Sequence, residues 1–363
     1  MKTYRSRSFA FGPMYLTLLV SAFLAMQTVQ AFGAHVIRSR WEFLEELGGN
    51  QMTMHAVRRA VAGRKPQFLV QAPPLILPYH NGQVLAGNQI SIYITWYGRF
   101  SKAQKSTIMD FLASFKPSKK ILKVISSPSV SSWWKPTAAY KDVEGKAVSP
   151  SLKVSGQVVN RRTSLGKNLK TADVETLVVT SLETFPADAN AIYLILTADD
   201  VEVESFCDSS CGSHSSLGVW TSGQEVILPY AWVGNSGLQC PGQCAWPFAS
   251  PKPPAGPVQI PLLPPNGDVG LDGMIINIAA MLAGAATNPF DNAYYQGDAS
   301  LPLEAATACE GLFGPGSYPG YPGRLLFDNA GSSFNAYGIH GRKFLLPALW
   351  NPITFNCQTL PTD

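Results

Sequence analysis

The chain has 363 residues, enough for one large domain with a hydrophobic core, and only 14% of them are charged. This low charge excludes a disordered acidic or basic protein, and the abundant glycine (31) and proline (28) have no fixed period, which excludes collagen. The formal net charge is +4, but Lys2, Arg5 and Arg7 precede the first apolar segment, so the rest of the chain is nearly neutral. A nearly neutral body argues against nucleic-acid binding.

Residues 1–31 have the organisation of a secretory signal peptide. An apolar stretch from Phe9 to Met26 follows the basic residues, and Val29-Gln30-Ala31 gives a small-x-small cleavage pattern. A signal anchor is the alternative, but the most apolar part, residues 14–26, is short for the roughly 20 residues that span a bilayer. We therefore predict cleavage after Ala31, secretion, and no membrane span in the mature chain.

Residues 32–70 form a polar lead-in, which is either a linker or a pro-segment cut at its basic pairs. The folded domain is predicted to occupy residues 71–363. The turn signal at residues 79–82 predicts a hairpin made by residues 75–78 and 83–85. Strict alternation predicts a strand at 89–97. Ser101 and Gln104 then form a capping box before an apolar helix face.

Further elements follow in order. The pattern predicts a strand at 153–160, a helix from Thr171, a buried strand at 191–197, a strand at 225–234 and an apolar helix at 268–286. This order predicts a single α/β (α+β) domain with a mixed central sheet and packed helices. Its C-terminal half is rich in proline and glycine.

All six cysteines lie in that half: Cys207, Cys211, Cys240, Cys244, Cys309 and Cys357. An even number in a secreted chain favours disulfides. We predict a Cys309–Cys357 bridge, with the other four cysteines pairing among themselves in an order that the sequence leaves open. The alternative is zinc held by two C-x-x-x-C hooks, but structural zinc sites use tighter spacing.

Candidate catalytic residues are acids and one histidine. They are Asp199, Asp200, His214, Asp268 and Asp272. Paired carboxylates could hydrolyse a glycosidic bond, and acids with a histidine could move a proton or hold a metal. The structural alternative is that the first two acids lie in a solvated loop and that Asp268 caps the helix.

Four tryptophans are candidates for stacking on a sugar ring: Trp133, Trp134, Trp232 and Trp246. Trp133 and Trp134 are adjacent and point to opposite sides of an extended chain, so at least one is expected in the core. The sequence has no G-x-S-x-G elbow and no HExxH motif. We therefore expect no cofactor and no metal, and we favour a protein without enzymatic activity.

Several long blocks, some with cysteines, carry a family resemblance. They are AGNQISIYITWYGRF (86–100), PSVSSWWK (128–135), SLGK (164–167), LTADDVEVESFC (196–207), CGSH (211–214), YAWVGN (230–235), CPGQCAWPF (240–248), NGDVGLDGMIINIAAMLAG (266–284) and NAYGIHGRKFLLPALW (335–350). In these blocks the sequence resembles the EXORDIUM-like, or phosphate-induced, family of secreted plant proteins.

The resemblance implies a protein of the extracellular space, apoplast or cell wall that is tied to growth and cell expansion. It also implies links to brassinosteroid response and to carbon status. The family has no accepted reaction, so the resemblance implies no catalytic residue. We expect the protein to act by binding a cell-wall component or a cell-surface protein. A polysaccharide-modifying hydrolase and a glycan-binding module are the alternatives.

The apolar helix is also similar to the central helix of zinc-metalloprotease-like proteins. Zinc ligands four residues apart would fall on Ala280 and Gly284, with the catalytic base at Met281, and none of these side chains can serve. This similarity implies a zincin-like fold with a degenerate metal site. The alternative is an ordinary buried core helix.

Overall fold

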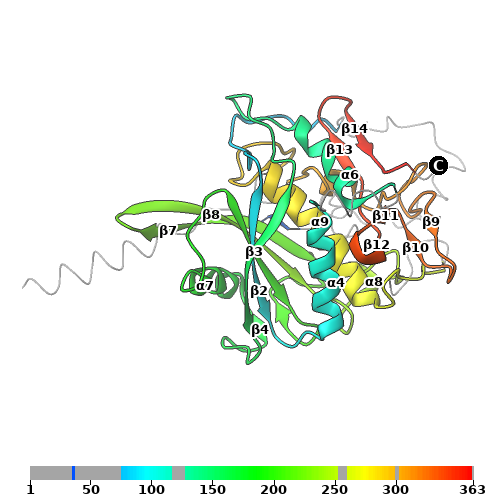
Figure 1. The fold of residues 1–363 in the computed structure, drawn as a ribbon, viewed down its shortest axis with the longest axis horizontal. Coiled ribbons are helices and arrows are strands. Elements are labelled where there is room, and N and C mark those ends of the chain that lie inside the picture. Colours follow the sequence, from blue (N-terminus) through cyan, green and yellow to red (C-terminus); the bar gives the residue numbers. More distant parts are fainter. Residues whose placement is uncertain (1–34, 37–74, 117–126, 252–259, 299–301, 362–363) are drawn as a thin grey trace, which may run out of the picture.

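A computed structural model describes residues 35–36, 75–116, 127–251, 260–298 and 302–361 (Figure 1). The predicted signal peptide lies outside the described residues, and so does all of the lead-in except His35 and Val36. The predictions made for those segments remain predictions.

The core of the molecule is a six-stranded mixed sheet with the order β1-β7-β8-β5-β2-β3. Its strands are β1 (His35–Val36), β2 (Ile90–Tyr97), β3 (Leu152–Asn160), β5 (Ala191–Thr197), β7 (Gly212–Thr221) and β8 (Gln224–Gly234). Strands β3, β2, β5 and β8 run parallel, whereas β7 is antiparallel to β8 and β1 is antiparallel to β7. The predicted α/β domain with a mixed central sheet is confirmed.

Helices cover both faces of the sheet. Helices α4 (Lys102–Ala113) and α9 (Val269–Thr287) lie on one face, and α7 (Thr171–Ser181) lies on the other (Figure 1). Parallel strands covered on both faces are apolar throughout, and every residue of β5 is buried. In β2, Tyr93 and Thr95 on the second face are buried like Ile92 and Ile94 on the first.

Helix α9 is the central helix of the domain. Asp268 caps its N-terminus, and its side chain accepts a hydrogen bond from the amide of Leu271 at 3.0 Å. Among the described residues it is the one helix long and apolar enough to cross a membrane, yet 94% of its apolar window is buried inside the protein. It is therefore a core helix of a folded domain, as the structural alternative predicted.

The C-terminal part of the chain covers the outer side of α4 and α9 (Figure 1). Phe344 packs edge-on against Phe111 of α4, with ring centroids 5.3 Å apart. The indole N–H of Trp133 donates to the carbonyl of Pro347 at 2.6 Å. The short elements of the domain are α6 (Val130–Trp134), η1 (Lys135–Ala139), β4 (Asn168–Leu169), β6 (Glu202–Val203), α8 (Pro241–Cys244), η2 (Thr307–Cys309), β9 (Leu326–Phe327), β10 (Ser333–Phe334), β11 (Ala336–Tyr337), η3 (Ile339–Gly341), β12 (Lys343–Phe344), β13 (Leu349–Asn351) and β14 (Asn356–Gln358).

One local prediction was wrong. Residues 75–85 form no hairpin, because Tyr79 bridges to Tyr294 and Ala86 bridges to Val148 instead. Trp133 and Trp134 lie in helix α6 and not in an extended chain, and both are buried, which confirms that at least one of them belongs to the core. The capping box of Ser101 and Gln104 is confirmed.

Candidate functional site

Three of the five candidate catalytic residues lie at the carboxyl edge of the parallel strands, where open α/β sheets bind their ligands. Asp199 and Asp200 follow β5, and Asp268 lies at the start of α9. At this edge the loops after β2 and β5 touch: Gly98 has a φ of 97°, and a Cβ there would lie 2.7 Å from that of Ala198.

Each of these carboxylates has a structural partner or neighbour. Asp200 pairs with the ammonium of Lys167 at 2.5 Å. Asp268 accepts from the side-chain amide of Gln104 at 3.2 Å in addition to capping α9. Burial raises the pKa of Asp199, and the charges of Asp200 and Asp268 raise it further. The capping role weighed for Asp268 is confirmed.

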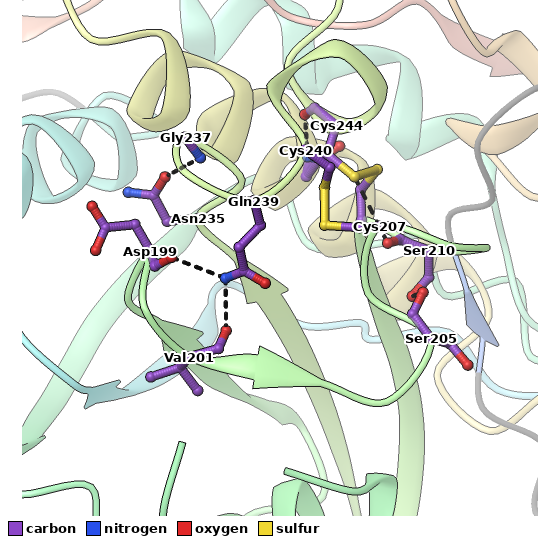
Figure 2. The surroundings of a disulfide bond; sticks show 12 residues. Asp199, Val201, Ser205, Cys207, Ser210, Asn235, Gly237, Gln239, Cys240 and Cys244 are labelled. Atoms are coloured by element: carbon purple, nitrogen blue, oxygen red, sulfur yellow. Dashed lines mark hydrogen bonds between the residues drawn. A yellow bond between two sulfur atoms is a disulfide. The ribbon is translucent and has the colours of Figure 1, made fainter. Parts of the chain in front are cut away.

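The loop that carries Asp199 is tied to the segment after β8. The side-chain amide of Gln239 donates to the backbone carbonyls of Asp199 and Val201, at 3.0 Å each (Figure 2). Figure 2 also shows Gly237, whose amide donates to the side chain of Asn235. These bonds fix the backbone of the edge.

The other two candidates lie elsewhere. Asp272 is 3% exposed, and its two oxygens accept from the amide and the side chain of Asn266. His214, on β7, lies beside Gly284, about 24 Å along α9 from Asp268 at 1.5 Å per residue. The structure therefore does not bring the five candidates into one cleft.

His214 belongs to a buried polar cluster with Glu304 and Asn288. Its Nε2 lies 2.6 Å from Oε2 of Glu304, and the amide of Asn288 donates to the other carboxylate oxygen at 2.7 Å. Asp291 is close enough that the charges of His214 and Glu304 act on it, and its pKa is raised to about 7, mainly by burial. His214 is fully buried and Glu304 is 2% exposed, so this candidate lies in the core and not at the protein surface.

A polar pocket of about 390 Å³ lies between α4, the loop before α9 and the turn at η3. It is lined by Asp110, Pro265, Asn266, Asp328, His340, Gly341, Arg342 and Lys343. The sequence analysis did not single out these residues as a site. The only signal was the basic turn of residues 338–343, which lies within one of the blocks that carry the family resemblance.

A chain of hydrogen bonds links this pocket to the core. Asn266 joins the buried Asp272 to Arg342, whose guanidinium binds Asp110. His340 binds the second oxygen of the Asp110 carboxylate. Desolvation raises the pKa of Asp272 to about 7, so the buried end of this chain of bonds titrates near neutrality.

The candidate tryptophans are mostly core residues. Trp133, Trp134 and Trp232 are at most 3% exposed, and their indole N–H groups donate within the protein. Trp246 is half-buried against Phe313. These burials leave the first three rings no face for a sugar. Among the described residues, the exposed tryptophan is Trp220, which the sequence analysis did not single out; it is 77% exposed near the tip of the β7–β8 hairpin.

All six cysteines form disulfides. The predicted Cys309–Cys357 bridge is confirmed, and the remaining pairs are Cys207–Cys240 and Cys211–Cys244. Cys207–Cys240 (Figure 2) and Cys211–Cys244 link the segment before β7 to the N-cap residue and the last residue of helix α8. The zinc alternative is therefore wrong for these cysteines.

Nothing supports a metal centre at the zincin-like positions of α9. Within the part of the chain that the structure describes, no group of three or more His, Cys, Asp or Glu side chains is placed to hold a metal ion. Ala280, Met281 and Gly284 are buried in the core. No solved structure matches the chain significantly, so the zincin-like fold stays unconfirmed.

The fold and its covalent links define a mixed α/β domain held by three disulfides. The family model described as the phosphate-induced protein 1 conserved region matches residues 77–360. The chain belongs to this family, which includes the EXORDIUM proteins.

The chain resembles several curated relatives along most of its length. It is 48% identical to Protein EXORDIUM-like 2 of Arabidopsis thaliana over 302 residues, which are 83% of this chain and 95% of the relative. It is 48% identical to Protein EXORDIUM of the same plant over 290 residues, or 78% and 89% of the two chains. It is 46% identical to Protein PHOSPHATE-INDUCED 1 of Nicotiana tabacum over 305 residues, or 82% and 93%.

Proposed function

We propose that this protein is a secreted regulator of growth and cell expansion in the apoplast or cell wall, and that it acts by binding and not by catalysis. The observation that carries the proposal is the pairing of all six cysteines, because such disulfides form and persist in oxidising, extracytoplasmic compartments. The links to brassinosteroid response and carbon status come from the family resemblance.

The arrangement of the acids supports binding over hydrolysis. Asp268 caps α9, Asp200 holds Lys167, and Asp272 is bonded to Asn266 inside the core. His214 lies at the other end of α9. A glycosidase needs one carboxyl group to donate a proton and a second to act as base or nucleophile across the same bond. Asp199, with its raised pKa, and Asp268 are the pair from which hydrolysis would have to come.

Secretion is tested on protein expressed in plant cells. We expect the mature chain to begin at Phe32 or, if the lead-in is removed, near residue 71, and we expect no cysteine to react with an alkylating agent before reduction. A protein retained inside the cell with reactive cysteines would contradict the proposal.

Binding and catalysis are separated by incubating the oxidised protein with cell-wall polysaccharides. We expect saturable binding without release of soluble products. Asp268→Asn is the variant that separates binding from catalysis, because asparagine caps a helix as well as aspartate but cannot act as an acid or a nucleophile. Product release that disappears in this variant would make the protein a hydrolase.

The glycan-binding alternative has its own variant. Trp220→Ala removes the exposed ring near the hairpin tip without touching the core. If wall binding depends on sugar stacking at this tip, the variant loses it; Glu144→Gln, an exposed acid elsewhere, serves as the control.

A further inference from the structure

The polar pocket offers hydrogen-bond donors, while its carboxylates are already engaged. The two oxygens of Asp110 accept from His340 at 2.9 Å and from Arg342 at 3.1 Å. Asp328 accepts from the amides of Ala330 and Ser332 with one oxygen and from Lys343 with the other. The backbone donors and Lys343 also hold the pKa of Asp328 below its usual value.

The donors that remain belong to Arg342 and Lys343. A guanidinium carries five N–H donors and an ammonium three. Within the described residues, Arg342 uses Nε on Asp110 and makes one long contact of 3.5 Å to Asn266. Lys343 uses one donor on Asp328, and its ammonium lies 5.2 Å from the ring centroid of Phe334. Both side chains are about 30% exposed, so the remaining donors can reach a ligand. Such a pocket fits a ligand rich in acceptors.

The turn that carries these side chains is held rigidly. His340 has a φ of 56°, a left-handed conformation that costs a non-glycine residue on the order of 1 kcal/mol. Its neighbour Ile339 donates its amide to the hydroxyl of Ser114 at 2.9 Å, and a Cβ on Gly338 would lie 2.4 Å from the ring of Phe344. Strain that is kept in place by its surroundings is common at ligand sites.

The size and lining of the pocket narrow the class of ligand. Its volume of about 390 Å³ lies in the lower range of small-molecule sites and exceeds what a lone ion needs. Seven of the eight lining residues are polar or glycine, and Pro265 is the exception. A polar molecule with an oxyanion would match this volume and the donors of Arg342 and Lys343.

We propose that this pocket binds a small sugar acid, with the carboxylate on Arg342 and Lys343 and the hydroxyl groups toward Asn266 and His340. The proposal names a ligand class for the extracellular binding protein and rests on that proposed function. Arginine suits the planar carboxylate because its fork matches the two oxygens, and lysine adds a second charge.

The test is calorimetric titration of the oxidised, full mature protein with galacturonate, galactose, glucose 6-phosphate and inorganic phosphate. We expect saturable binding of galacturonate that weakens with salt, and no binding of the neutral galactose. Lys343→Gln should weaken galacturonate binding at least tenfold, and Arg342→Gln should do the same. Lys167→Gln is the matched control, since Lys167 also pairs with an aspartate but lies outside the pocket.

The outcomes separate this proposal from the proposed function. Because Arg342→Gln also disturbs Asp110, thermal unfolding of each variant is recorded. If the arginine variant does not fold, the binding measured with Lys343→Gln decides the question. No saturable galacturonate binding, or unchanged binding in Lys343→Gln, would overturn the proposal. Tighter binding of glucose 6-phosphate or inorganic phosphate than of galacturonate would overturn the carboxylate assignment. If Lys343→Gln still binds cell-wall polysaccharides, the proposed function remains supported, and only the role of the pocket in that binding is contradicted.

Discussion

Nε2 of His214 and Oε2 of Glu304 lie 2.6 Å apart in the core, although 90 residues separate them in the chain. His214 is fully buried and Glu304 is 2% exposed, so the pair contacts no bulk solvent. The contact joins the antiparallel strand β7 to the segment after α9. It also lies against Gly284, where a Cβ would come 2.5 Å from the imidazole.

Removing the histidine should destabilise the domain strongly. We expect His214→Ala to lower the free energy of unfolding by about 3 kcal/mol or more, because it removes one hydrogen-bond partner of the buried Glu304 carboxyl and opens a cavity. Urea unfolding measures the loss. Glu304→Gln is the matched variant, since glutamine fills the same space without the charge, and it should cost less. A change below about 1 kcal/mol for His214→Ala would contradict a structural role for the pair.

The buried carboxyls should make the protein more stable in acid than at neutrality. Asp272 and Asp291 have folded-state pKa values near 7 against a usual value of 3.8. The folded state thus binds protons that the unfolded state releases, so stability is full below pH 3.8 and is lost as the pH rises toward 7. We expect Asp272 alone to contribute a fall on the order of 4 kcal/mol.

Urea unfolding between pH 4 and pH 8 checks this dependence. Asp272→Asn should flatten the fall, at the cost of one hydrogen bond from Asn266 at low pH. Glu144→Gln, which changes an exposed acid, should leave the profile as it is. A stability that rises over this range in the unmodified protein would show that other groups dominate.

The Cys309–Cys357 disulfide should stabilise the C-terminal part of the chain, the layer that covers the outer side of α4 and α9. It closes a segment of 48 residues, and chain entropy predicts a stabilisation of about 4 kcal/mol for a loop of that length. The double variant Cys309→Ser with Cys357→Ser keeps the other two bridges, and urea unfolding of the oxidised proteins gives the difference. Equal midpoints for the variant and the unmodified protein would mean that packing alone holds this layer.

The cap of α9 can be tested by two substitutions at one position. Asp268→Ala should lower the free energy of unfolding by about 1 kcal/mol, because the amide of Leu271 loses its acceptor. Asp268→Asn should leave it within a few tenths of a kcal/mol, because asparagine accepts the same bond. Thermal or urea unfolding distinguishes the two, and an equal loss in both would mean that the carboxylate charge and not the cap matters.

The central elements could be predicted from the sequence because their patterns are unambiguous. Residues 191–197 are continuously apolar, and the sequence that forms α9 is apolar on nearly every side, so each could only be a buried element. Strand β7 gave no such signal, since its first half is made of glycine, serine and histidine. It becomes a strand through its long antiparallel ladder with β8.

The polar pocket could not be predicted for a related reason. Its residues come from positions 110, 265–266, 328 and 340–343, and only tertiary packing brings these segments together. Neither Asp110 nor Arg342 differs in sequence context from an ordinary surface residue. The wrong hairpin at residues 75–85 has the same origin, because Tyr79 stacks on Tyr294, more than 200 residues later, at 4.6 Å between ring centroids.

The late position of α9 has a consequence for synthesis. Strands β2, β3 and β5 leave the ribosome long before residues 269–287, yet this helix covers one face of their sheet. Early residues also bond to the last ones, as Tyr140 does to the carbonyl of Trp350. A nascent chain therefore exposes an apolar sheet face until almost the whole sequence has been made. We expect C-terminal truncations to aggregate or bind chaperones instead of folding, and the protein to fold only after translation is nearly complete.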